Sequence, residues 1–88
     1  MLIVSLVERI REILKEAGGL QRDISALADG DDLYSAGLTS HATVGLMLAI
    51  EEAFEFEFPD RLLSRRTFTS VNTIVAALEE IGVRKVVA

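Results

Sequence analysis

Apolar residues recur at helical spacing in separate segments of this 88-residue chain, and this periodicity constrains its fold more than any other feature. The first segment carries one apolar stripe, made of Ile3, Leu6, Val7, Ile10, Ile13, Leu14 and Ala17. Charged residues fill the opposite side, as in a helix that packs on a core. Ser5 and Glu8 have the spacing of a capping box, and Gly18-Gly19 ends the pattern. We therefore expect a regular helix that begins near Ser5 and ends at these glycines.

A second helix is predicted from about Ser40 to Phe54. One face of it consists of Thr43, Leu46, Met47, Ile50, Ala53 and Phe54. Val44 and Leu48 lie four residues apart on a neighbouring strip, and no residue from Ala42 to Ile50 is charged. The first half of this helix is therefore apolar nearly all round, unlike an ordinary surface helix.

The last helix is predicted from about Ser70 to Ile81, with Thr69 as its cap and Gly82 as its stop. Its buried stripe is Val71, Ile74, Val75, Leu78 and Ile81. Before it, Phe54 to Pro59 alternates like a strand, but no partner strand is evident, so we expect an extended connection. Asp60 to Arg65 is expected to form a short third helix. We expect the tail, residues 83–88, to fray.

These elements predict an all-α fold with three main helices and one short helix, in a single domain spanning residues 1–88. The connection from Gly18 to Thr39 is longer than most loops in compact domains, which suggests a function. We expect its apolar residues to anchor it on the core: Leu20, Ile24, Leu27, Leu33 and Leu38.

Composition excludes several classes of function. The chain has no cysteine, which rules out disulfides, thiolate metal sites and a cysteine nucleophile. Its net charge of −5 does not suit nucleic-acid binding, which needs a basic face. The apolar run at the N-terminus is too short to span a membrane and has no basic leader. We expect a cytoplasmic protein that binds neither nucleic acid nor membrane.

The chemically informative position is Ser40, which the long loop delivers to the start of a helix. Helix starts expose unpaired backbone N–H groups and the positive end of the helix dipole. A phosphate there meets favourable donors, so Ser40 is well placed to carry a phosphodiester. Position alone leaves a second interpretation open, because a serine at a helix start is commonly only a cap.

The segment from Asp32-Leu33-Tyr34 to Gly37-Leu38-Thr39-Ser40 resembles the D-L-F-x-x-G-L-D-S signature of acyl and peptidyl carrier proteins. The similarity continues in register over nearly the whole chain. Residues 49–54 resemble the A-L-E-E-x-F end of the family's second helix. Residues 58–60 resemble its I-P-D entry to the short third helix, and residues 68–71 resemble the I-T-T-V start of the fourth.

The resemblance implies a cofactor and a role for Ser40. A phosphopantetheinyl transferase, using coenzyme A and magnesium, would attach 4′-phosphopantetheine to the Ser40 hydroxyl. Thr39 and His41, which flank this serine, are assigned to the same cofactor-binding site. The thiol of the arm would hold an acyl or aminoacyl cargo as a thioester. The chain itself would be a carrier and not an enzyme, with no catalytic residues and no metal ligands.

Several positions depart from the family pattern. Thr39 stands where most carriers have aspartate, which puts recognition by a generic transferase in doubt. Ala42 and Gly45 replace positions that are acidic in fatty-acid carriers. The region of the short third helix is basic here, through Arg61, Arg65 and Arg66. Because charge complementarity governs partner choice, these changes argue against a housekeeping fatty-acid role.

A surface for partner proteins is predicted from Leu38, Val44, Leu48, Arg61, Leu62, Arg65 and Arg66. A partner with an apolar groove could bury Val44 and Leu48. Ordinary core packing of these two side chains is an equally weighted alternative. Gly45 would let a partner's backbone approach closely, at a cost of about 1 kcal/mol in helix stability.

Residues 37–40, 58–63 and 65–68 look most like those of small stand-alone carriers served by amino acid:carrier protein ligases. The cargo would then be an amino acid such as glycine or alanine, which the ligase loads and a downstream acceptor enzyme receives. We expect a monomer. A fatty-acid or polyketide carrier is the alternative, and an unmodified helical interaction module, favoured by Thr39, is a rival from another class.

Two other patterns are set aside. Ser40-His41 is not a nucleophile–base pair, because adjacent residues of a helix do not face each other. His41 is expected on the surface beside the prosthetic arm. The acidic cluster Asp29, Asp31 and Asp32 lacks the spacing of a calcium-binding loop and is expected to be a solvated turn.

Overall fold

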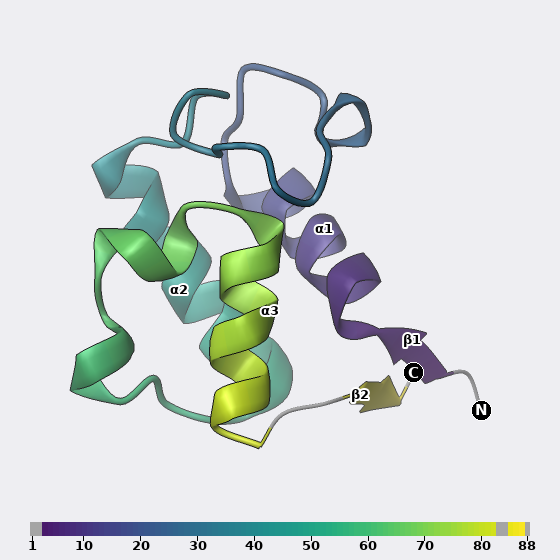
Figure 1. Ribbon diagram of the computed structural model, residues 1–88, viewed down its shortest axis with the longest axis vertical. Helices are drawn as coiled ribbons and strands as arrows, with labels where there is room; N and C mark the ends of the chain where they lie inside the picture. The colour runs from purple at the N-terminus through teal and green to yellow at the C-terminus, as the bar shows by residue number, and fades with distance from the viewer. Residues whose placement is uncertain (1–2, 83–84, 88) are drawn as a thin grey trace.

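The computed structural model describes residues 3–82 and 85–87, which form three α-helices around one core (Figure 1). The helices are α1 (Leu6–Ala17), α2 (Ser40–Phe54) and α3 (Val71–Glu80). The connections contain three 3₁₀ turns: η1 (Ile24–Ala26), η2 (Asp60–Leu62) and η3 (Arg65–Phe68). Two short strands, β1 (Ile3–Ser5) and β2 (Lys85–Val87), pair with each other. The predicted fold class, a bundle of three main helices, is confirmed.

The strand pair is a feature that the sequence analysis did not predict. Apolar spacing predicts Ile3 on the helical stripe, but Ile3 pairs with Val87 in an antiparallel register, and Ser5 pairs with Lys85. The expectation of a frayed tail is therefore wrong for residues 85–87, while residues 83, 84 and 88 lie outside the described residues. β-Branched residues favour extended backbone, and both strands contain them.

The helix boundaries follow the predicted caps closely at α1 and α2. The Ser5 side chain accepts a hydrogen bond from the Glu8 backbone N–H. α1 ends at Ala17, and the N–H of the C-cap residue Gly18 donates to the Leu14 carbonyl. α2 spans the predicted range, Ser40 to Phe54, and Thr39 caps its start. The predicted cap of α3 is wrong by one residue.

Ser70, not Thr69, caps α3. The Ser70 hydroxyl accepts from the Thr73 N–H, and the Thr73 hydroxyl accepts from the Ser70 N–H, which makes a reciprocal capping box. Residue type alone does not separate the two, because both Thr69 and Ser70 carry a hydroxyl suited to a cap. The Thr69 hydroxyl instead donates to the carbonyl of Arg65.

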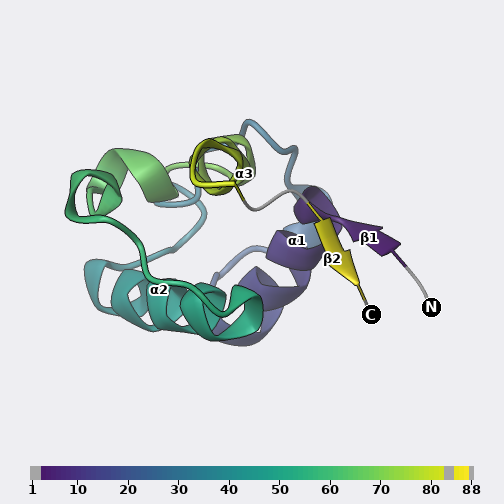
Figure 2. The ribbon, with the colours of Figure 1, turned by 90° about the horizontal axis from the view of Figure 1, so that it is seen from below.

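The predicted third helix from Asp60 to Arg65 is replaced by the two turns η2 and η3. Leu63 has φ −85° and ψ 68°, and Ser64 is extended with φ −137° and ψ 159°, so the helical path is broken between them. Figure 2 shows this segment closing one side of the space between α2 and α3. The path of this segment brings Leu63, Ser64 and Arg65 opposite the N-terminal half of α2, where they share a cavity with α2 residues.

The segment after α2 is an extended connection, as predicted. Its aromatic rings pack edge to face in series, with centroid distances of 6.5 Å for Phe54–Phe56, 4.8 Å for Phe56–Phe58 and 5.5 Å for Phe58–Phe68. The Glu51 carboxylate accepts a hydrogen bond from the Phe58 N–H at 2.8 Å. These contacts fix the start of the segment that carries η2 and η3.

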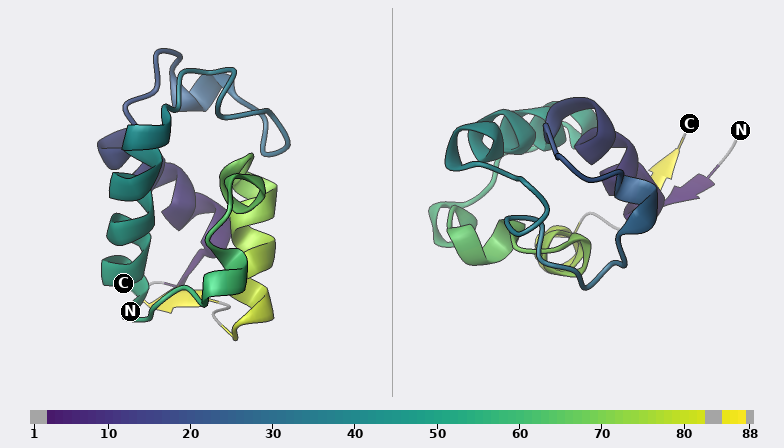
Figure 3. Two further views of the ribbon diagram at one scale, coloured as in Figure 1. Left: turned by 90° about the vertical axis from the view of Figure 1, so that its left-hand side faces the viewer. Right: turned by 90° about the horizontal axis from the view of Figure 1, so that it is seen from above.

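Side chains from all three helices fill the core. The largest fully buried ones are Ile10, Leu14, Leu33, Leu46, Ile50, Ile74, Leu78 and Val71. Leu33 comes from the long connection, which crosses one end of the bundle (Figure 3, left). The predicted anchors Ile24, Leu27, Leu33 and Leu38 are buried, and Leu20 packs at the edge of the core.

A single arginine of α1 also holds this connection. The Arg11 guanidinium donates to the carbonyls of Ile24 and Leu27, at 2.8 Å and 2.6 Å. It also contacts the Asp29 carboxylate, at 2.7 Å in the shorter of two hydrogen bonds. The Asp29 carbonyl in turn accepts from the N–H of Asn72, the second residue of α3. The loop is thereby tied to both α1 and α3.

Candidate functional site

The chain reaches Ser40 through a tight turn at residues 33–38. The Leu33 N–H donates to the Thr69 carbonyl at 2.7 Å, and the Leu38 N–H donates back to the Leu33 carbonyl at 3.0 Å. Gly37 has φ +114°, and a Cβ at this position would lie 2.8 Å from the backbone nitrogen of Gln21. Glycine is therefore required there, and the turn fixes the direction in which the chain enters α2.

Ser40 is the first residue of α2, and its side chain is exposed. Thr39 fills the role of the cap, because its hydroxyl oxygen accepts from the Ala42 N–H at 2.9 Å. The Thr43 hydroxyl donates to the Thr39 carbonyl at 2.8 Å, which further fixes this first turn. The Ser40 hydroxyl is thus not needed for capping, and this removes the main structural explanation for a serine at this position.

A cavity of about 290 Å³ opens beside Ser40, between the start of α2 and the η2–η3 segment. Its walls are Tyr34, Ser40, Thr43, Val44, Met47, Leu63, Ser64, Arg65 and Phe68. Val44, Met47, Leu63 and Phe68 give it an apolar wall, whereas Arg65 contributes a positive charge. The spacing of the α2 residues indicates a helix face, but no sequence pattern indicates that residues 63–68 lie opposite it.

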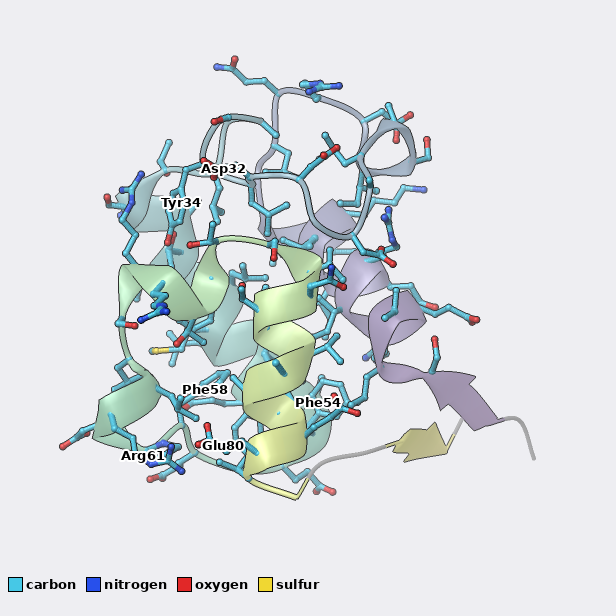
Figure 4. The ribbon with its side chains drawn as sticks, viewed as in Figure 1. Asp32, Tyr34, Phe54, Phe58, Arg61 and Glu80 are labelled. Carbon is cyan, nitrogen blue, oxygen red and sulfur yellow. The ribbon has the colours of Figure 1, made fainter. Side chains whose placement is uncertain are left out.

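Tyr34 and Arg65 connect the long loop before α2 to η3 through two contacts. The guanidinium carbon of Arg65 lies 3.9 Å from the centroid of the Tyr34 ring, in a cation–π contact. The Tyr34 hydroxyl also donates to the Arg65 carbonyl at 3.3 Å. Figure 4 shows Tyr34 reaching from the loop toward the η3 turn. Tyr34 was not predicted as a site residue, and its only sequence signal is a tyrosine where the resembled family has phenylalanine.

The structure resolves the alternatives for the apolar strip of α2. Val44 and Leu48 are 55% and 54% exposed, so they are not core residues. Leu38, by contrast, is only 3% exposed, so its assignment to a partner surface is corrected to a core role. Its burial follows from the tight turn, which points the residue before Thr39 into the bundle.

The remaining predicted partner residues lie on the η2–η3 segment. Arg61 is exposed and pairs with Glu80 of α3 at 2.8 Å (Figure 4). Leu62 is half-buried against the core. Arg65 and Arg66 are both exposed, and neither forms a salt bridge with any carboxylate in residues 3–82 or 85–87.

His41 and the acidic residues Asp29, Asp31 and Asp32 show no arrangement that would bind a metal ion. His41 is exposed on the first turn of α2, next to Ser40. Asp29 pairs with Arg11, Asp31 accepts from the Ala28 N–H, and Asp32 accepts from the Tyr34 N–H and the Ser35 hydroxyl. In the part of the chain that the structure describes, no group of three or more histidine or acidic side chains could hold a metal ion.

This arrangement fits a phosphodiester-linked arm on Ser40. The hydroxyl is exposed, and the Ser40 and His41 amides precede both the first intrahelical hydrogen bond and the Ala42 amide that Thr39 caps, so they can face a phosphate. The cavity begins at the same residue and offers an apolar surface to the start of a flexible chain.

A family model described as "Phosphopantetheine attachment site" matches residues 6–78. The chain belongs to this family. It is therefore a carrier protein and not an enzyme, and its cofactor is covalently attached 4′-phosphopantetheine. Among the described residues, no helix is both long and apolar enough to cross a membrane.

Two curated relatives support this membership. The chain is 55% identical to the aminoacyl carrier protein of Agrobacterium fabrum over 65 residues, which covers 74% of this chain and 78% of the relative. It is 32% identical to the acyl carrier protein of Akkermansia muciniphila over 77 residues, which covers 88% of this chain and 92% of that protein.

Solved structures agree in fold. A carrier protein from Agrobacterium tumefaciens, in complex with an engineered Bradyrhizobium japonicum glycine:[carrier protein] ligase and ATP, matches with a TM-score of 0.83 and 48% identity over 85% of this chain and 97% of that chain. The holo acyl carrier protein of Nitrosomonas europaea matches with a TM-score of 0.74 and 27% identity over 85% and 93% of the two chains.

Proposed function

We propose that residues 1–88 form a single carrier domain in which 4′-phosphopantetheine is attached to Ser40 and holds an amino acid. The observation that carries the attachment site is the exposed Ser40 hydroxyl on the first turn of α2, with Thr39 as the cap. When bound, the arm supplies a terminal thiol that holds the cargo as a thioester. Thr39 and His41 flank the attachment point and shape its surroundings.

The proposed partners are a phosphopantetheinyl transferase, an amino acid:carrier protein ligase and a downstream acceptor enzyme. The named activity of the Agrobacterium relative and the ligase complex of its structural counterpart support amino acid cargo. We place the carrier in the cytoplasm as a monomer. Coenzyme A, the donor of the arm, is required by the transferase.

The surface around Ser40 supports a dedicated ligase over a fatty-acid partner. His41, Val44 and Leu48 are exposed on α2, and no residue from Ala42 to Ile50 is charged. A partner that relies on acidic residues of this helix would find none near the attachment point. A partner with an apolar groove could bury both Val44 and Leu48.

The test begins with purified apo-protein, coenzyme A and a broad-specificity transferase. Intact mass should increase by one phosphopantetheine, and Ser40→Ala should not be modified. If neither this transferase nor the one from the native cells modifies the wild-type protein, the chain is an unmodified interaction module and the proposal fails.

Cargo is tested on the modified protein with two loading enzymes. An amino acid:carrier protein ligase should form an aminoacyl thioester with ATP and its amino acid, while a malonyl transacylase of fatty-acid synthesis should load the protein poorly. Efficient malonyl loading, with no aminoacylation by a ligase from the same cells, would replace the aminoacyl assignment with a fatty-acid or polyketide one.

A further inference from the structure

The η2–η3 segment separates two hollows of the surface. In a 3₁₀ turn, residues three apart lie on the same side, and the residues between them point elsewhere. Arg65 and Phe68 of η3 accordingly line the cavity beside the attachment point. Arg66 and Thr67 instead line a groove between this segment and α3, with a volume of about 380 Å³. The two hollows have no lining residue in common, so the groove is a separate feature.

The groove against α3 is largely satisfied in its own polar groups. The Thr67 hydroxyl lies 3.4 Å from the Ser64 hydroxyl, and the Thr73 hydroxyl takes part in the capping box of α3. Its one acidic side chain, Glu80, pairs with Arg61 at 2.8 Å (Figure 4). The rest of the lining is Leu62, Ala76, Ala77 and Arg66. An apolar surface with one available cation remains.

Arg66 is that cation. It is exposed and forms no salt bridge within residues 3–82 and 85–87. Arg22 and Arg65 also lack such a partner, but neither lines this groove. A guanidinium binds a carboxylate through two parallel N–H donors. The groove therefore suits a carboxylate side chain flanked by small apolar side chains.

The charge of the chain indicates how such a partner would approach. Three of the nine basic residues lie within residues 61–66, in a chain whose net charge is −5. An acidic element is thus attracted to this segment and repelled by most of the remaining surface, which fixes its orientation. The same segment forms one wall of the cavity beside Ser40, so a partner that reaches the arm lies next to the groove.

We propose that this groove docks a carboxylate-bearing segment of the amino acid:carrier protein ligase. An Asp or Glu side chain of the ligase pairs with Arg66, and small apolar side chains next to it pack on Leu62 and Ala76. This rests on the proposed loading of an arm attached to Ser40. The contact orients the carrier on the ligase, so it acts on binding and not on the chemical step.

The test measures KM and kcat for ligase-catalysed aminoacylation of the modified carrier at low salt, with mass spectrometry establishing the modification first. Arg66→Glu is the diagnostic variant. Arg22→Glu is its matched control, because both arginines are exposed, both lack a carboxylate partner among the described residues, and both changes reverse one charge. Arg66→Glu should raise KM by about five-fold or more, with kcat within about two-fold, and Arg22→Glu should change KM by less than about two-fold.

A second pair of variants tests the groove without removing its cation. Ala76→Glu places a carboxylate in the groove, where it competes with the ligase for Arg66, and should also raise KM. Ala26→Glu adds the same charge on η1, outside the groove, and should leave KM unchanged. All four substituted residues are exposed, so the melting temperatures should stay within about 3 °C of wild type. The KM ratio of Arg66→Glu to wild type should shrink in 1 M NaCl, where the screening length is about 3 Å.

Two outcomes overturn the inference and are distinguishable. If the modified protein is loaded but Arg66→Glu and Arg22→Glu have the same KM, the ligase does not dock on Arg66 and the carrier function is unaffected. If the wild-type protein is never modified at Ser40, or no ligase from the same cells loads it, the proposed function fails and the docking inference fails with it.

Discussion

Arg11 is the residue that most directly connects α1 to the loop that positions Ser40. Its guanidinium satisfies two backbone carbonyls, those of Ile24 and Leu27, as well as the Asp29 carboxylate. Its side chain is only 25% exposed, so these hydrogen bonds are partly shielded from water. Unpaired carbonyls in such a place cost more than the loss of a fully solvated ion pair.

We predict that Arg11→Ala lowers the free energy of unfolding by roughly 2 to 3 kcal/mol, measured by urea denaturation. The control is Arg9→Ala on the same helix, which removes an exposed pair with Glu12 and should cost no more than about 0.5 kcal/mol. Equal losses in the two variants would show that Arg11 does not hold the loop.

Asp23 gives a prediction about pH. The backbone N–H of Ser25 donates to its carboxylate at 3.0 Å, and this hydrogen bond is the main reason that the pKa of Asp23 lies below its ordinary value of 3.8. The Ser25 side chain and the charge of Lys15 lower the pKa further, while slight desolvation opposes them.

Because the pKa of Asp23 is lower in the folded state, its contribution to stability is present above the unfolded value and is lost as the pH falls through the folded value. A carboxyl-carbon NMR titration should place the Asp23 midpoint below 3.8. In Asp23→Asn, this part of the pH dependence should vanish. A midpoint at or above 3.8 would contradict the hydrogen bond at this turn.

The elements differ in how far sequence could predict them. α1 and α2 were placed within a residue or two because apolar periodicity and a polar cap agree at each start. The strand pair was missed because its partners lie at opposite ends of the chain, where local periodicity carries no information on pairing. The division of the third helix into η2 and η3 depends on the backbone at Leu63 and Ser64, neither of which is a helix breaker by type.

Substitutions at Gly37 and Gly45 test the conformation of the turn before α2 and of α2 itself. Gly37→Ala should destabilise the protein by about 1 to 3 kcal/mol, because φ is +114° and the new Cβ would meet the Gln21 backbone. Gly45→Ala should instead stabilise it by up to about 1 kcal/mol, because nothing lies within 4 Å of a Cβ there. Both are measured by chemical denaturation, and a gain in stability for Gly37→Ala would refute the strained turn.

At the scale of the whole molecule, the site lies where the loop, α2 and η3 converge. Ser40, its cap and the apolar character of α2 could be read from the sequence. The cavity could not, because Tyr34 and Arg65 are far apart in sequence and meet only through the path of the η2–η3 segment. The burial of Leu38 also depends on this three-dimensional path, since an apolar residue next to the site fits either a surface or a core.

The exposed apolar strip of α2 gives a prediction about partner recognition. Leu48→Glu should reduce kcat/KM for ligase-catalysed aminoacylation by about ten-fold or more, because it places a charge in an apolar contact. Its melting temperature should change little, since Leu48 is 54% exposed. Ala26→Glu is the control, because Ala26 is exposed on η1 and is not among the residues of the predicted partner surface, and its loading should be unchanged. Equal loading of the two variants would place the partner elsewhere.

The most direct test of attachment at Ser40 is peptide mapping, by mass spectrometry, of protein isolated from its native cells. The account predicts that the peptide containing Ser40 carries phosphopantetheine, that fragmentation places the group on Ser40 and not on Thr39 or Thr43, and that Ser40→Ala protein from the same cells carries none. A bare Ser40 under all growth conditions, or an arm attached to another hydroxyl, would contradict it.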